Sequence, residues 1–126
     1  MMNYDFFIAQ LRFIAQKTER EAGDVSEMMD ALEDVIVQLE SGSGTFHVKH
    51  QDLRITARAL AGVAGFMQQH ILPEVIAAVN PIGEEQVRWT IETCMSMMAN
   101  LMTHAELNND EKDMDVELPP RPESNS

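Results

Sequence analysis

The sequence has little of several residue types, and each shortage narrows the class of protein. A single cysteine, Cys94, among 126 residues excludes an intramolecular disulfide and fits a reducing compartment without proving one. No apolar run approaches the ~18 residues of a membrane-spanning helix. The first residues include Asp5 and lack the basic stretch of a secretory signal, so we expect a cytoplasmic protein.

Basic residues are also scarce. The chain carries 9 Lys and Arg against 21 Asp and Glu, which gives a formal net charge of −12. Nucleic-acid backbones and anionic membranes bear the same sign of charge, so we expect direct binding to neither. The charge instead suits a basic protein as the partner.

Motifs for catalysis or cofactor binding are missing from the sequence. The Ser41–Gly44 stretch is rich in glycine but lacks the lysine of a P-loop. Neither Glu-x-x-His nor His-Glu-x-x-His occurs, although di-iron bundles and zinc proteases need them. Cys94 has no histidine near it in the sequence, which argues against a catalytic thiol. We therefore expect a non-enzymatic protein without a cofactor.

What the chain does have is helical periodicity. Apolar residues recur every three or four positions in two stripes: Leu53, Ala57, Leu60, Ala64, Met67 and Ile71, then Val87, Ile91, Cys94, Met98, Leu101 and Ala105. At about 3.6 residues per turn, each stripe lies on one side of a helix and needs a partner helix to leave water. A chain of this length fits one domain. The sequence therefore predicts an all-α four-helix bundle over residues 1–107.

Capping and breaking signals divide this region into helices. They are expected over residues 3–22, 24–40, 47 or 50 to 71, and 81–107. Gly23, the Ser41–Gly44 connector and Asn80-Pro81 mark the boundaries. Pro73 has no backbone N–H, so the third helix is expected to kink or break there, and Pro73 could equally begin a short helix that runs through Val79. The short connections predict antiparallel up-and-down order, and no sheet is expected.

The composition changes at Asn108. Residues 108–126 carry six acidic residues against two basic ones, together with three prolines and few apolar side chains. Such a segment cannot bury enough apolar surface to offset the entropy of ordering. Residues 108–126 are therefore predicted to form a disordered acidic tail that folding does not need.

The third predicted helix carries a basic ridge in an otherwise acidic chain. His50, Arg54 and Arg58 follow one another at four-residue steps, with His47 one turn before them. The preferred interpretation is that the ridge matches the acidic side of the second helix. Binding of an acidic ligand or partner and simple solvation are the alternatives.

Two further helix surfaces of apolar or small residues lie outside the two core stripes. Small residues, including Ala61 and Gly65, line one side of the third helix, and Trp89 and Met97 lie off the main stripe of the fourth. Either face can pack inside the bundle or bind a second copy, and Trp is enriched at interfaces. We expect a homodimer, because monomers usually avoid a large uncovered apolar patch.

The function favoured by these observations is a small acidic module that binds another protein as an adaptor, chaperone or inhibitor. The candidate interaction residues are His50, Arg54, Arg58, Ala61, Gly65, Trp89 and Met97. Two alternatives stay open. One is an acidic decoy that mimics nucleic acid, and the other is a metal-binding bundle or enzyme that uses His47, His50 and glutamates.

Overall fold

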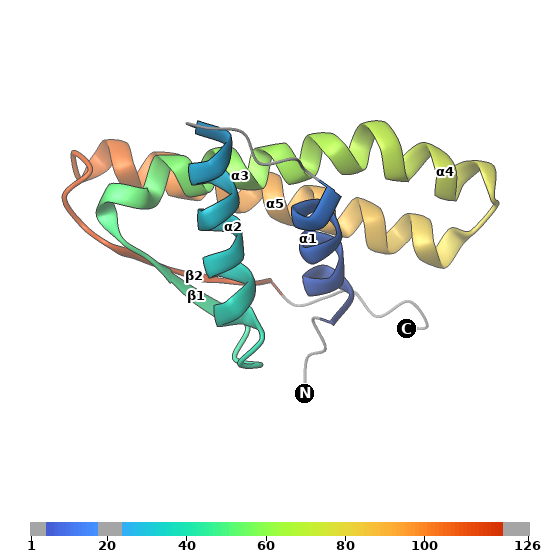
Figure 1. Ribbon diagram of the computed structural model, residues 1–126, viewed down its shortest axis with the longest axis horizontal. Helices are drawn as coiled ribbons and strands as arrows, with labels where there is room; N and C mark the ends of the chain where they lie inside the picture. The colour runs from blue at the N-terminus through green and yellow to red at the C-terminus, as the bar shows by residue number, and fades with distance from the viewer. Residues whose placement is uncertain (1–4, 18–23, 120–126) are drawn as a thin grey trace.

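The computed structural model describes residues 5–17 and 24–119, and helices make up most of them (Figure 1). The elements in chain order are α1 (Asp5–Lys17), α2 (Asp24–Leu39), β1 (Thr45–Val48), η1 (His50–Asp52), α3 (Leu53–Phe66), η2 (Met67–Ile71), α4 (Leu72–Ala77), α5 (Pro81–Leu107) and β2 (Met114–Glu117). The predominantly helical class is confirmed, with one strand pair added to it. The boundary predicted at Gly23 lies outside the described residues.

Two long helical segments form the base of the fold. α3, η2 and α4 follow one another directly, and α5 runs back along them. α1 and α2 pack against each other, and α2 also packs on α3. In Figure 1 these two helices run across the long pair and not alongside it. The predicted up-and-down order of four aligned helices is therefore wrong. With 13 and 16 residues, α1 and α2 are each much shorter than the 27-residue α5.

The two apolar stripes form the centre of the core, as predicted. Leu60 of α3 and Leu101 of α5 are fully buried. The shorter helices cover the stripes with buried residues of their own: Phe7, Leu11 and Ile14 from α1, and Met29, Leu32, Val35, Ile36 and Leu39 from α2. Because all these residues belong to one cluster, the described helices share a single core.

The irregular part of the third helical segment precedes Pro73. η2 is a π-helical turn in which the Leu72 N–H bonds to the Met67 carbonyl five residues earlier. α4 then begins at Leu72 and continues through Pro73. In a regular α-helix the proline ring would clash with the carbonyl four residues before it. The chain thus meets the constraint of Pro73 with a wider turn upstream, where the sequence predicts a kink or break at the proline itself.

The strand pair corrects two predictions. β1 and β2 are antiparallel, with Thr45 opposite Glu117 and Val48 opposite Met114. The prediction that no sheet forms is therefore wrong, and His47 and Val48, at the earlier of the two predicted starts of the third helix, belong to the strand. The tail predicted to be disordered from residue 108 is ordered as far as residue 119, and Val116 and Leu118 are buried in the core. Residues 120–126 lie outside the described part of the chain.

The connections follow the predicted signals. Gly42 and Gly44 adopt φ angles of 88° and 73° after α2, in the left-handed region that glycine enters without penalty. The Asn80 side chain accepts a hydrogen bond from the Gly83 N–H at 3.0 Å and caps α5, as the Asn-Pro signal predicts. Within the described residues, no helix is long and apolar enough to cross a membrane.

Candidate functional site

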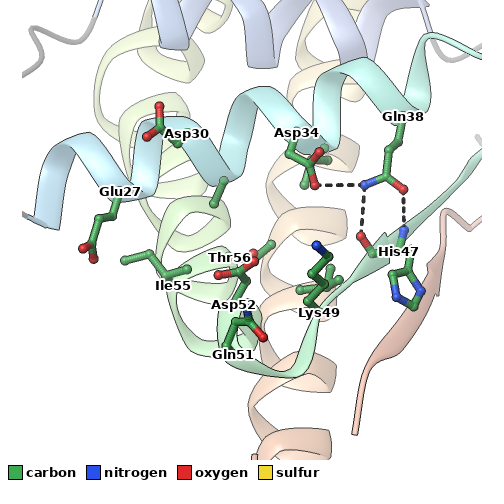
Figure 2. Close-up of a pocket in the computed structure, with 13 residues that line it drawn as sticks. Glu27, Asp30, Asp34, Gln38, His47, Lys49, Gln51, Asp52, Ile55 and Thr56 are labelled. Atoms are coloured by element: carbon green, nitrogen blue, oxygen red, sulfur yellow. Dashed lines mark hydrogen bonds between the residues drawn. The ribbon is translucent and has the colours of Figure 1, made fainter.

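A cleft of about 700 Å³ lies between α2 and the segment that runs from β1 through η1 into α3 (Figure 2). We call it the acidic groove. Its lining residues are Glu27, Asp30, Ala31, Asp34, Val35, Gln38, His47, Val48, Lys49, Gln51, Asp52, Ile55 and Thr56. A cleft of this size falls within the range of sites that hold a ligand or a short segment of another protein.

Carboxylates dominate the groove. Glu27, Asp30 and Asp34 follow helical spacing on α2, so they lie along one wall (Figure 2). Asp52 of η1 adds a fourth carboxylate from the opposite side, and Lys49 is the one lysine or arginine in the lining. Carboxylates on both walls attract a cationic group that enters the cleft.

One wall of the groove contains a strand edge that a side chain covers. The Gln38 carboxamide accepts a hydrogen bond from the His47 backbone N–H at 2.7 Å and donates one to the His47 carbonyl at 3.0 Å (Figure 2). It also donates to the Asp34 carboxylate at 3.1 Å. α2 and β1 are therefore joined by polar contacts at one end of the cleft (Figure 2).

His47 also belongs to a cluster of histidines and aspartates beside the groove, which we call the His–Asp clamp. His47 Nδ1 lies 2.7 Å from Asp115 Oδ1, and His47 Nε2 lies 3.1 Å from Asp113 Oδ2. Only the imidazolium form has a proton on both ring nitrogens. Hydrogen bonding to Asp115, and then to Asp113, accordingly raises the pKa of His47 above its usual 6.5.

Asp113 is the centre of the clamp. Its Oδ1 accepts from the His50 backbone N–H at 2.7 Å and lies 2.9 Å from His50 Nδ1. The bonds from His50, followed by the one from His47, lower the pKa of Asp113 from 3.8 to about 2. The clamp thus joins the segment after α5 to the start of the third helical segment.

The basic ridge is paired within the chain, but with a different partner from the one predicted. Arg54 Nε and Nη2 contact the two carboxylate oxygens of Asp110 at 3.0 and 3.3 Å. His50 pairs with Asp113. The expected match with the second helix is wrong, because the ridge faces the segment after α5, which the sequence predicts to be disordered. Arg58 is separated from these pairs and lines an apolar depression with Met28 and Phe66.

The other candidate interaction residues lie on different surfaces. Met97 is buried in the core, and half-buried Trp89 meets the Phe7 ring edge-on at 5.6 Å. Both side chains are thus used inside the fold, which is the intramolecular alternative for that face. On α3, Ala61 is half-buried and Gly65 is exposed. The seven candidates therefore do not form one site.

The acidic groove was not among the residues singled out from the sequence. The acidic spacing on the second helix is visible there, but the other wall depends on β1, which the sequence assigns to the connector and to a possible start of the third helix. Gln38 carries no signal of its own, because its role depends on the strand that it covers.

The described residues offer few side chains suited to metal binding or to nucleophilic catalysis. No three His, Cys, Asp or Glu among the described residues are arranged to hold a metal ion. His47 and His50, which could face one ion if helical, are instead bonded to aspartates. Burial raises the pKa of the Cys94 thiol to about 12, so it stays protonated and unreactive at neutral pH.

Comparison with protein families, with curated proteins and with solved structures gives no match for this chain.

Proposed function

We propose that this protein is a non-enzymatic binding module that takes a basic segment of another protein into the acidic groove. The observation that carries the proposal is the pairing of shape and charge. A cleft of about 700 Å³ has carboxylates on both walls and one lysine in its lining. Opposite charges across an interface steer association and select partners. Such a contact would suit an adaptor, a chaperone or an inhibitor.

Glu27 and Asp52 give the sharpest test, because they stand on opposite walls of the groove. The probe is a short peptide of alternating lysine and valine, titrated by calorimetry at two salt concentrations. We expect saturable binding that weakens with salt, and Glu27→Gln with Asp52→Asn should weaken it about tenfold. The matched control is Glu92→Gln with Glu111→Gln, which removes the same charge from exposed positions outside the groove.

Two results would overturn the proposal. One is no binding of the peptide at low salt. The other is equal weakening by the groove variant and the control, because this would mean that only the net charge of −12 attracts the peptide. A nucleic-acid decoy remains the alternative. It would compete with DNA for a DNA-binding protein and would be insensitive to the shape of the cleft.

A further inference from the structure

The structural feature of interest is the edge of β1 that faces α2, which we call the outer edge. Among the described residues, β1 pairs with β2 alone. The Leu118 N–H bonds to the Gly44 carbonyl at 2.9 Å, just beyond the paired register. Bonded and non-bonded pairs alternate in an antiparallel ladder. Phe46 and Val48 therefore bond toward β2, while Thr45 and His47 turn their N–H and C=O groups toward the outer edge.

Side chains occupy the positions that a further strand would take. The Gln38 carboxamide has the same donor and acceptor as a peptide group, and it bonds to both the N–H and the C=O of His47. Ser43 Oγ lies 3.4 Å from both the N and the O of Thr45. The two outward-facing residues of β1 are thus each satisfied on both backbone groups by one side chain.

A covered edge has a protective explanation, because exposed strand edges invite aggregation. Protection alone does not explain why the edge meets a cleft lined by carboxylates at His47, the outward-facing residue that lines the groove (Figure 2). The charge of the groove also specifies what can approach the edge, namely a cationic chain.

We propose that the partner's basic segment binds as an extended strand along the outer edge of β1 and displaces the Gln38 carboxamide from His47. This inference rests on the proposed function and specifies how the groove is filled. Main-chain hydrogen bonds would supply affinity, and alternate side chains would supply specificity. Because side chains alternate along a strand, a basic residue at every second position can face the carboxylates of α2 and η1.

Backbone methylation of the alternating lysine–valine peptide tests the strand directly. N-methyl groups remove hydrogen-bond donors without changing the charge. Methylation on alternate residues in the register that faces β1 should weaken binding about tenfold or more, while the other register should leave it nearly unchanged. Equal affinity of both methylated peptides and the unmodified one would overturn the strand addition.

Gln38 provides a second, independent measurement. Gln38→Ala removes the group that the peptide must displace, so the peptide should bind about threefold more tightly. Gln51→Ala is the matched control, because Gln51 also lines the groove but belongs to η1, on the wall opposite α2. In the wild type, the amide resonance of His47 should shift on binding. An unchanged affinity in Gln38→Ala with an unmoved His47 resonance would overturn the inference.

The outcomes separate the two proposals. Binding that depends on Glu27 and Asp52 but ignores methylation keeps the groove as a binding site and overturns the strand. Absence of binding by every peptide overturns both.

Discussion

The Asp113 carboxylate bonds to both the backbone and the ring of His50, although 63 residues separate the two positions. Through this pair the segment after α5 closes against the start of the third helical segment. The Arg54–Asp110 pair and the β1–β2 ladder repeat the connection on either side. The strand that forms one wall of the acidic groove is consequently held by residues from the other end of the chain.

The first prediction concerns Asp113 and acid. Its pKa is lowered from 3.8 to about 2 in the folded state, so its contribution to stability is complete above pH 4 and is lost as the pH falls toward 2. Asp113→Asn should flatten this part of the pH–stability curve, measured by denaturant unfolding at several pH values. Glu111→Gln, at an exposed neighbouring position, should leave the curve as in the wild type.

The contribution of His47 to stability has the opposite dependence on pH. Its pKa is raised in the folded protein, so its contribution is complete below pH 6.5 and is lost as the pH rises through the higher folded value. Nuclear magnetic resonance titration of the His47 ring should show the raised pKa in the wild type. Asp115→Asn should lower it, because Asp115 is its main partner. A His47 pKa that does not change in this variant would contradict the clamp.

The segment formed by β2 and the Leu118 that follows it should stabilise the folded state, contrary to what the composition of the tail suggests. Leu118 is 3% exposed, and its replacement by alanine should lower the free energy of unfolding by about 2–4 kcal/mol. Glu117→Ala, at the exposed neighbouring residue, should change it by less than about 0.5 kcal/mol. Chemical denaturation monitored by circular dichroism decides between them. Equal stability of both variants would mean that residues 114–118 do not pack on the core.

The helical stripes could be predicted from the sequence because a helix repeats every few residues, so local spacing reveals its buried side. Leu60 and Leu101 are found where the spacing places them. The strand pair could not be found in this way. Thr45–Val48 has only four residues, and its partner lies more than sixty residues further along the chain. β1 has two buried residues and β2 has one, and this alternation is too short to outweigh the polar composition around it.

The acidic partner of the basic ridge could not be predicted from the sequence for a different reason. The chain has 21 acidic residues, so spacing shows that Arg54 has candidates but does not select Asp110. The groove depends on the same information. Its carboxylates on α2 are visible in the sequence, whereas the wall opposite them exists only once the segment after α5 has paired with β1.

The core stripes yield a direct test of the helical base. Leu60→Asp and Leu101→Asp each place a charge without a partner at a fully buried position, and each should cost about 3–5 kcal/mol. Gln68→Asp, at an exposed position of η2, is the control and should change stability little. Thermal melting followed by circular dichroism measures both. Near-wild-type stability in either leucine variant would show that its stripe does not face a core.

Val79 is expected to store strain between α4 and α5. Its φ of 52° lies in the left-handed region, which is unfavourable for a β-branched residue, and the side chain is 84% exposed. Val79→Asn should therefore raise the free energy of unfolding by about 1 kcal/mol, because asparagine tolerates this conformation and little burial is lost. Val79→Ala should gain less. A loss of stability in Val79→Asn would indicate that the valine makes a contact outweighing the strain.

The last prediction concerns self-association. A face of α3 bears Gly62 and Gly65, and a Cβ added at either would meet no atom within 4 Å. Such a surface lets another backbone approach closely, and the exposed Phe13 lies 6.5 Å from the half-buried Phe66 ring. We expect a homodimer through this face in sedimentation at micromolar concentration.

Gly65→Glu should dissociate the dimer without unfolding the chain, since glutamate favours helix more than glycine does. Ser96→Glu adds the same charge at an exposed position of α5 and should leave the dimer intact. A wild-type monomer across the concentration range would rule the dimer out.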